Sequence, residues 1–394
     1  MTICPHNDCT GCFACQNACT HDALRLMPGE YGYIYPVVDS EKCVNCGLCR
    51  KVCPVNTPVA KHTVISADIA RAASAEEIVL SSSGGIATVL VREVLRQGGV
   101  VYGSTGVDGS NVHHIRIDSE DKVDLLKGSK YVQSHINDVY RQVKSDLSEG
   151  IKVLFIGTPC QNAGLRNYLH RDYESLVCVD FICHGVPSHE LLSRHVVEMT
   201  SLTPEQTGEV TFRTRDSKGR SIYGVTVCDS KGNLVYSSHY PKDEYITAFI
   251  HGVTYRESCY SCNYATCERV SDITLGDYWD KEHRFGLEGL SMLLVNTDKG
   301  RSLFQAVKSS VNIIDHSDVD TFAVRNQQLK EPMRRNPRRD IFLELYPTQG
   351  FCHAAHTVLI DSRRAIRNQR IKDFLFKLPF LQTIYNIIRP PKQP

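Results

Sequence analysis

The chain opens with two cysteine-rich segments, CTGCFACQNAC at residues 9–19 and CVNCGLCRKVCP at residues 43–54. In each segment three cysteines recur at every third position, and a fourth follows four residues later. Three thiolates at this spacing on a tight loop ligate one [4Fe-4S] cluster, while the fourth ligates the cluster of the other segment. The pair of segments therefore predicts two [4Fe-4S] clusters.

The predicted ligand sets cross between the two segments. The first set is Cys9, Cys12, Cys15 and Cys53, and the second is Cys43, Cys46, Cys49 and Cys19. This is the ligand pattern of bacterial dicluster ferredoxins, so we expect residues 1–58 to fold as a small ferredoxin-type domain. Cys4 lies outside the spacing and is expected to be a spare thiol rather than a ligand.

Two other uses of these cysteines fit the pattern less well. Disulfides need an oxidising compartment, and no signal peptide precedes the run, so we expect a cytoplasmic chain. Zinc sites use two separated pairs of ligands, which would not explain triplets with a trailing fourth cysteine. One departure is that Thr20 follows Cys19 where proline follows Cys53, which puts only the local geometry in doubt.

The composition is that of a globular protein with two or three domains. Of 394 residues, 42% are hydrophobic and 23% are charged, and no apolar run reaches the length of a membrane span. The net charge of +1 hides an asymmetry, because residues 325–394 carry 14 Lys and Arg against 5 Asp and Glu. This basic tail on an acidic body predicts contact with an acidic partner, with a membrane surface or with the body itself.

The middle of the chain alternates buried strands with amphipathic helices. After an expected linker at about 55–75, the pattern predicts strands at 100–102, 152–157, 176–182 and 292–296, and helices at 86–95, 159–169, 190–199 and 302–309. This alternation predicts a parallel core, and short strands with turns at 209–240 predict an antiparallel meander. The expected fold class is α+β or α/β: a ferredoxin-type domain, an α/β body and a basic helical tail.

A second group of cysteines lies in the body. Cys160 and Cys183 each follow an expected strand, where sites in parallel sheets are built. Cys259 and Cys262 could complete a four-thiolate site for a third [4Fe-4S] cluster or a zinc ion, and Cys267 could replace one of them. Unliganded buried cysteines remain an alternative, since cysteine is often buried.

Several motifs together resemble the family of the β subunits of coenzyme F-420 hydrogenases and dehydrogenases, in the version with a fused ferredoxin. They cover roughly residues 1–325: GYIYP at 32–36, SGG at 83–85, KGSKYVQS at 127–134, GTPCQ at 157–161, CHG at 183–185, the Cys259–Cys262 pair and SDITLGDYW at 271–279. Each motif is short, but their combination is specific.

The resemblance implies an FAD protein with a [4Fe-4S] cluster beside the flavin, held by Cys160, Cys183, Cys259 and Cys262. The FAD pyrophosphate would lie near Ser83, Gly84 and Gly85, where uncovered amides at a helix start attract phosphate. The resemblance also implies that Ser129 and Lys130 contact a phosphate or the ring of the flavin. Asp272 and Asp277 would shape the site, and His184 would donate a proton. A capping role for the glycines and structural roles for the other side chains are the alternatives. No Gly-x-Gly-x-x-Gly fingerprint is present, so a Rossmann site is not expected.

The sequence therefore predicts an iron–sulfur flavoprotein oxidoreductase that exchanges electrons with a partner such as a ferredoxin. Its substrate would be coenzyme F-420, a pigment or a glycan precursor, since such relatives are also associated with polysaccharide biosynthesis; no nucleic acid is expected. The alternatives are an electron-transfer subunit without its own substrate and a scaffold without cofactors. The expected domains are 1–58, 59–150, 151–325 and a basic tail at 326–394, whose apolar positions from Ile371 to Ile388 could lie on a membrane.

Overall fold

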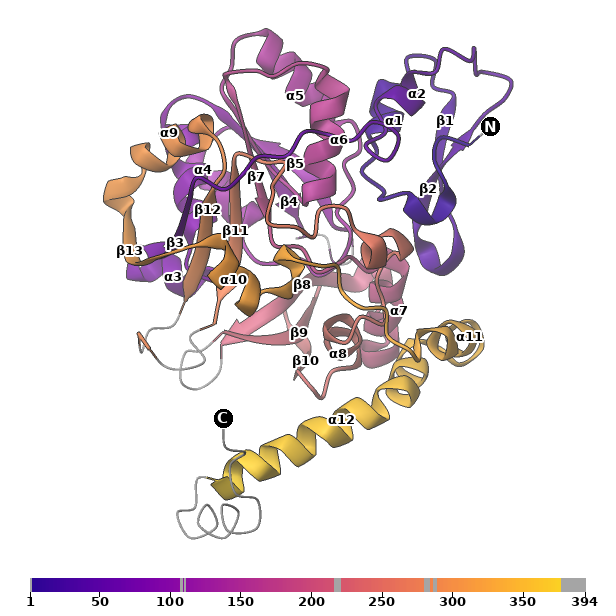
Figure 1. Ribbon diagram of the computed structural model, residues 1–394. Helices are drawn as coiled ribbons and strands as arrows, with labels where there is room; N and C mark the ends of the chain where they lie inside the picture. Colours follow the sequence, from indigo (N-terminus) through magenta and orange to yellow (C-terminus); the bar gives the residue numbers. More distant parts are fainter. Residues whose placement is uncertain are drawn as a thin grey trace, which may run out of the picture.

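The body is built on one eight-stranded mixed sheet with the strand order β13-β3-β12-β11-β7-β6-β4-β5 (Figure 1). The computed structural model describes residues 2–106, 109, 111–215, 221–279, 284–285 and 289–376. Four neighbouring strands are parallel: β4 (Val100–Thr105), β6 (Val153–Ile156), β7 (Leu176–Phe181) and β11 (Ile273–Tyr278). This confirms the predicted parallel core, whose strands read as apolar runs because both faces are covered.

Antiparallel strands extend this core on both sides. β5 (His113–Ile117) pairs with β4, while β12 (Leu290–Val295), β3 (Ser66–Ala72) and β13 (Val311–Ser317) follow β11. The linker expected at 55–75 is therefore wrong for β3, which lies between two other strands and is mostly buried. Its three alanines, Ala67, Ala70 and Ala72, carry little hydrophobic signal, although they fit a strand that is covered on both faces.

Helices cover both faces of the sheet. α4 (Ile86–Arg96) and α9 (Asp298–Ala306) pack on one face, and α5 (Val139–Ser148) and α6 (Pro159–Leu169) pack on the other. The ferredoxin-type region contributes α1 (Ala14–Ala18), α2 (Leu48–Lys51) and the hairpin of β1 (Leu24–Pro28) and β2 (Ile34–Val38). It lies beside α5 and α6 in Figure 1, and α1 joins their core cluster. Shorter helices are α3 (Ala75–Leu80) and α10 (Val319–Arg325).

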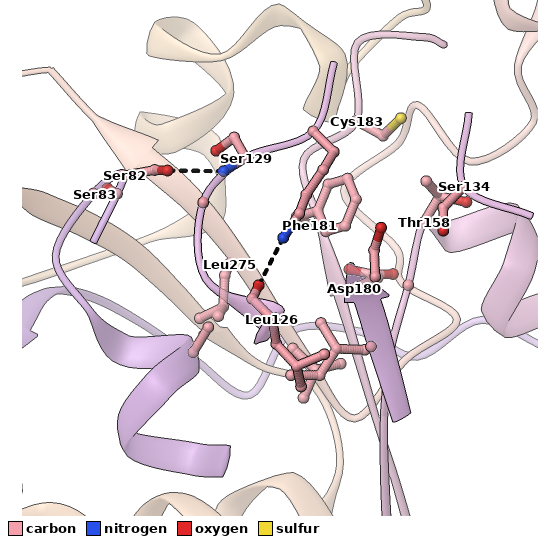
Figure 2. A pocket seen from close by; sticks show the side chains of 18 of the residues that line it. Ser82, Ser83, Leu126, Ser129, Ser134, Thr158, Asp180, Phe181, Cys183 and Leu275 are labelled. Atoms are coloured by element: carbon pink, nitrogen blue, oxygen red, sulfur yellow. Dashed lines mark hydrogen bonds between the residues drawn. The ribbon is translucent and has the colours of Figure 1, made fainter. Parts of the chain in front are cut away.

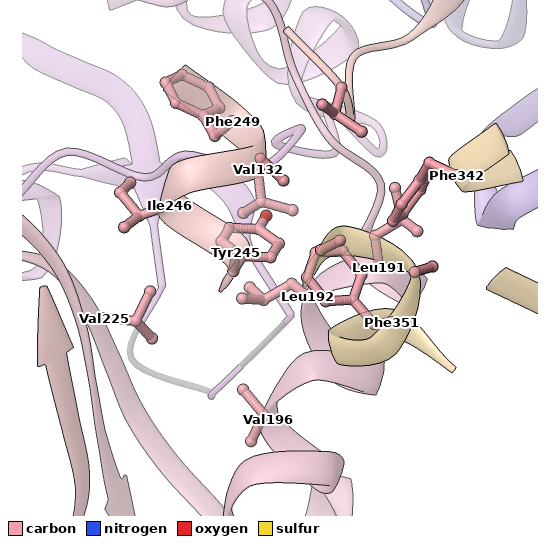
Figure 3. Packing of buried hydrophobic residues seen from close by; sticks show 14 of the residues in the cluster. Val132, Leu191, Leu192, Val196, Val225, Tyr245, Ile246, Phe249, Phe342 and Phe351 are labelled. Carbon is pink, nitrogen blue, oxygen red and sulfur yellow. The ribbon is translucent and has the colours of Figure 1, made fainter. Parts of the chain in front are cut away.

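The predicted meander forms a separate antiparallel sheet of β8 (Thr207–Arg215), β9 (Ser221–Asp229) and β10 (Leu234–His239). It shares a core with α7 (His189–Thr200), α8 (Glu244–Ile250), α11 (Arg339–Gln349) and α12 (Phe351–Phe376). Figure 3 shows Phe342 and Phe351 of the last two helices packing against Leu191, Leu192 and Tyr245.

The basic tail thus makes the predicted contact with the body over the start of α12. Phe351, Ala354 and Leu359 are fully buried, and Arg363 donates to the carbonyl of Pro241 and to Glu244. The apolar positions beyond Phe376, proposed above for membrane contact, lie outside the described residues. Within the described ranges, no helix combines the length and the apolar character that crossing a bilayer requires.

Candidate functional site

The two predicted ferredoxin-type cysteine sets lie in different environments. Cys19, Cys43, Cys46 and Cys49 line one small pocket under the β1–β2 hairpin. Cys46 is exposed and the other three are partly exposed, so this set lies at the protein surface. We refer to it as the outer set.

The other set lies between the ferredoxin-type region and the body. Cys12, Cys15 and Cys53 are each no more than 8% exposed, and burial raises the pKa of the Cys12 thiol to about 12. At Cys9, a hydrogen bond from Cys4 is the main cause that lowers the thiol pKa to about 5. Cys4 also bonds to Cys53, so the spare thiol packs against two members of this set. We call Cys9, Cys12, Cys15 and Cys53 the middle set.

The four body cysteines also come together. Cys160 begins α6 and Cys183 follows β7, while Cys259 and Cys262 lie in and after a short 3-10 helix, and all four line one pocket. Burial raises the pKa of Cys160 to about 11 and that of Cys259 to about 12, and neighbouring thiols in the group act in the same direction. We call these four cysteines the inner set.

Cys267 does not belong to this group. It packs in a different hydrophobic cluster, with Phe285 and Val319, and does not line the pocket of the inner set. The structure thus brings together the four cysteines singled out in the body and leaves their proposed substitute elsewhere.

A larger cavity of about 340 Å³ lies at the carboxyl ends of the parallel strands. Ile86, Ala87 and Thr88, the first turn of α4, line it, and Gly85 caps that helix with a φ of +77°. Figure 2 shows Ser82, Ser129 and Cys183 around the same space. A helix start facing a cavity supplies free backbone amides for an anionic ligand.

Most of the predicted flavin residues line this cavity, but several of their polar groups have partners within the protein. Ser83 and Gly84 bond to the β12 strand through Leu290 and Ser291, and Gly84 itself does not line the space. The Ser129 amide donates to Ser82.

The Lys130 ammonium donates to the carbonyls of Leu126 and Lys127, at 2.9 and 2.7 Å. Removal from water lowers the pKa of Lys130 to about 7. Lys130 thus holds its own loop together, and its charge state changes near neutral pH.

His184 and Asp277 also line the cavity, and Asp277 pairs with an arginine that the sequence did not single out. Arg213 of β8 pairs with Asp277, donates to the Tyr131 hydroxyl at 2.8 Å and stacks on Tyr223 at 4.0 Å. Burial lowers the pKa of His184, and the Arg213 charge acts in the same direction. His184 is thus held towards its neutral form, which can accept a proton.

Asp272 lies elsewhere. Its carboxylate accepts from the Cys178 amide at 2.7 Å and from the Thr297 hydroxyl at 2.6 Å, at the other end of β7. It therefore fixes the start of β11 and does not line the cavity.

The cavity and the inner set share a wall. Cys183, His184 and Gly185 line both spaces, as do Thr158 and Gln161. A group bound in the cavity would therefore lie against the inner set, with these and the other shared lining residues, Ser134 and Val186, between them.

Two arginines near the cavity and the inner set, Arg213 and Arg256, were not singled out in the sequence analysis. Arg213 lies in a strand that showed no motif, so nothing in the sequence pointed to it. Arg256 is fully buried and stands three residues before Cys259, a position that could have drawn attention.

Comparisons with known proteins agree with the two-part organisation. Residues 150–319 match the family model for the C terminus of the coenzyme F420 hydrogenase/dehydrogenase beta subunit. Residues 8–57 match the 4Fe-4S dicluster domain.

Individual relatives are distant. The F subunit of the F(420)H(2) dehydrogenase of Methanosarcina mazei is 18% identical over 324 residues, which are 79% of this chain and 85% of the relative. An uncharacterized ferredoxin of Methanocaldococcus jannaschii is 36% identical over 58 residues, 14% of this chain and 35% of the relative. A chain of the F420-reducing [NiFe] hydrogenase complex from Methanosarcina barkeri, solved in a xenon derivative, superposes with a TM-score of 0.45 at 15% identity, covering 68% of this chain and 90% of that one.

Proposed function

We propose that this chain, which matches the C terminus of the coenzyme F420 hydrogenase/dehydrogenase beta subunit over residues 150–319 and a 4Fe-4S dicluster domain over residues 8–57, is a flavoprotein oxidoreductase. The outer, middle and inner cysteine sets would each hold a [4Fe-4S] cluster, and the large cavity would hold FAD. Bound there, these groups would supply the chemistry for passing electrons between a redox partner and an organic substrate, such as coenzyme F-420 or a glycan or pigment precursor.

The observation that carries this proposal is the wall shared by the inner set and the cavity. Cys183 and His184 line both spaces. In a redox protein the polypeptide sets distance, potential and access, and the cofactors supply the chemistry. A single layer of residues between a cluster site and a ligand cavity would place the two cofactors at a short distance from each other.

The donor chemistry of the inner set supports a cluster rather than zinc. Four thiols are the ligand set of a [4Fe-4S] cluster. Zinc would need its ligands to converge at about 2.0–2.3 Å from one point. In the described part of the chain, no three His, Cys, Asp or Glu side chains are arranged to hold a single metal ion.

The order of the sets supports a linear path. The outer set is exposed, while the middle set reaches the body through Cys12, which packs against Gly164 of α6. Cys160 lies in the first turn of the same helix, and its thiol interacts electrostatically with that of Cys12. Tyr264 lines the pocket of the inner set, and burial together with the thiols of both the middle and inner sets raises the pKa of its hydroxyl.

The cavity residues support a flavin in a specific orientation. When bound, FAD would join the one-electron chemistry of the clusters to the two-electron chemistry of an organic substrate. The α4 start and the Ser129 loop would hold its phosphates, and His184 would hold or accept a proton near Cys183. Arg213, stacked on Tyr223, would hold Asp277 in place at the cavity wall.

Removing inner-set thiols tests the third cluster. The double variant Cys259→Ala/Cys262→Ala should lose about four irons per chain relative to the unaltered protein. Cys267→Ala is the matched control, because Cys267 lies nearby in the sequence but in another cluster of side chains, and should keep all its iron. Equal iron content in the double variant and the control would contradict the inner cluster.

A charge placed in the cavity tests the flavin separately. Ser129→Glu puts a carboxylate beside the proposed phosphate site, so we expect flavin content to fall at least tenfold while iron content is unchanged. The exposed Ser148→Glu on α5 is the control and should keep its flavin. Flavin retained in Ser129→Glu would place the cofactor elsewhere.

A further inference from the structure

Arg256 is a fully buried cation between the middle and inner cysteine sets. Its Nε donates to the carbonyl of Cys9 at 2.5 Å, and its Nη2 donates to the Cys9 Sγ at 3.5 Å and the Ile34 carbonyl at 3.0 Å. Its Nη1 donates to the Gln133 side chain at 3.2 Å, and its guanidinium stacks on Tyr35 at 4.2 Å. The side chain thus joins the body to the ferredoxin-type region from inside.

This cation has no carboxylate partner among the residues that the structure describes. Its neighbours are carbonyls, an amide, aromatic rings and a cysteine sulfur, whereas the buried Arg269 pairs with Asp180 at 3.0 Å. Burying an uncompensated guanidinium is strongly unfavourable, so buried charges normally have a counter-charge. The available counter-charges are the cysteine thiolates themselves.

The position of Arg256 ties it to both sets. Its guanidinium contacts the carbonyl and the Sγ of Cys9 in the middle set. Arg256 is also the N-cap residue of the short 3-10 helix that carries Cys259 of the inner set, and its carbonyl accepts from the Cys259 amide at 2.9 Å. One buried guanidinium is therefore built into the surroundings of two ligand sets in two parts of the fold.

We propose that Arg256 is a shared positioning residue that raises the reduction potentials of the middle and inner clusters together and holds their two parts of the chain in register. A thiolate-ligated cluster is anionic and becomes more negative on reduction, and hydrogen bonds to its sulfurs favour the reduced form. A buried cation near both clusters would stabilise both reduced forms and so raise both potentials. This inference rests on the proposed function for the inner cluster, whereas the contact with Cys9 does not depend on it.

The test is an EPR-monitored redox titration of Arg256→Met in the full-length, anaerobically purified protein. We expect the middle cluster's midpoint potential to fall by about 59 mV or more, a tenfold change in a one-electron reduction equilibrium. The inner cluster should shift in the same direction by a smaller amount, because the guanidinium contacts Cys9 directly. Iron content should stay that of the unaltered protein.

Arg141→Met is the matched control. Arg141 also joins the two parts of the chain, donating to the carbonyls of Gln16, Asn17 and Cys19, but it is exposed. It should leave the middle and inner potentials unchanged, because solvent screens its charge. An equal fall in both arginine variants would show that docking rather than the buried charge sets the potentials.

A second variant covers the case in which Arg256→Met does not fold. Arg256→Lys keeps the charge but cannot make all the contacts of the guanidinium. The midpoint potential of the middle cluster should therefore fall by less than about 59 mV. Unchanged potentials in Arg256→Met, or a fall of about 59 mV or more in Arg256→Lys, which keeps the charge, would overturn the proposal. A shift in the middle cluster with no inner EPR signal in any form would instead contradict the inner cluster and leave the role of Arg256 at Cys9 standing.

Discussion

The outer and middle cysteine sets are encoded by nearly the same spacing, yet they lie in opposite environments. The outer set is open to solvent at Cys46, whereas Cys12, Cys15 and Cys53 of the middle set are at most 8% exposed. The difference comes from the body, which covers one half of the ferredoxin-type region and leaves the other free. The two halves of a symmetric motif therefore differ in what they can contact: the outer set is open to a partner, and the middle set faces the inner set.

The contacts around the middle set explain how this direction is built. Cys12 packs on Gly164 of α6, and Arg256 bonds to Cys9 from the body side. The outer set has only one comparable tie in the described residues, the Arg141 contact with the Cys19 carbonyl. The middle set is therefore part of the body's packing, while the outer set depends mainly on its own loop.

The largest expected difference between the two sets is in stability. Cys53→Ala and Cys46→Ala should each remove about four irons, but Cys53→Ala should also lower the free energy of unfolding by about 1–3 kcal/mol more, because Cys53 is buried with Ile3. Metal binding and folding are coupled, so the effect would appear as a lower melting temperature. Iron analysis measures the loss of the cluster, and calorimetry measures the melting temperature. Equal melting temperatures for the two variants would contradict the claim that the middle set is part of the body's packing.

Gly164→Ala tests the tight contact of the middle set with the body. A Cβ at this position would lie 3.0 Å from the Cβ and Sγ of Cys12. Glycine to alanine in a helix interior normally stabilises by about 0.5–1 kcal/mol, but here overpacking should destabilise by about 1–3 kcal/mol. Denaturant unfolding gives the sign directly, and a stabilised variant would show that Cys12 has room to move.

Exposure also predicts which cluster is lost first in air. Oxygen reaches the outer set through Cys46, so its EPR signal should decay several-fold faster than that of the middle cluster. Timed exposure of reduced protein, followed by EPR, would measure the two decays. Simultaneous loss would mean that burial does not protect the middle set.

The smallest expected effect concerns the cavity, where Lys130 is a second cation removed from water. Its pKa falls from 10.5 to about 7 in the folded protein. Between these values the unfolded chain binds the proton that the folded chain has released, so this residue makes stability rise with pH above about 7. The melting temperature of the unaltered protein minus that of Lys130→Met should therefore increase from pH 7 to pH 9.

The exposed Lys144→Met on α5 is the control for this measurement and should give a difference that does not change with pH. A flat difference for Lys130→Met as well would mean that its ammonium stays charged in the folded state.

The sequence predicted the elements whose signal is local. The apolar runs of β6 and β7 and the periodicity of α4, α6 and α7 lie where expected, because buried strands and amphipathic helices show their pattern within a few residues. β3 was missed because its alanines read as a linker. The burial of Phe351 in the tail could not be foreseen, because it depends on helices α7 and α8, far away in the sequence.

In the candidate site, too, some residues could be predicted from a local pattern and others could not. Cysteine spacing predicted the outer and middle sets, because closely spaced thiols on one loop face a common centre. The inner set comes from three separate segments and was proposed from the strand ends and the family resemblance. Arg213 and Arg256 escaped prediction because a single arginine has no period or spacing, and its role depends on what surrounds it. Cys267 looked equivalent to Cys262 in the sequence, but lies in a different cluster of side chains.

The most direct test of the central claim is the cofactor content of the protein after anaerobic purification. We predict about twelve irons, about twelve acid-labile sulfides and one FAD per chain, at four irons per cluster. About eight irons and no flavin would confine redox chemistry to the ferredoxin-type region. The cavity and the inner set would then need another explanation, and the proposed oxidoreductase would be contradicted.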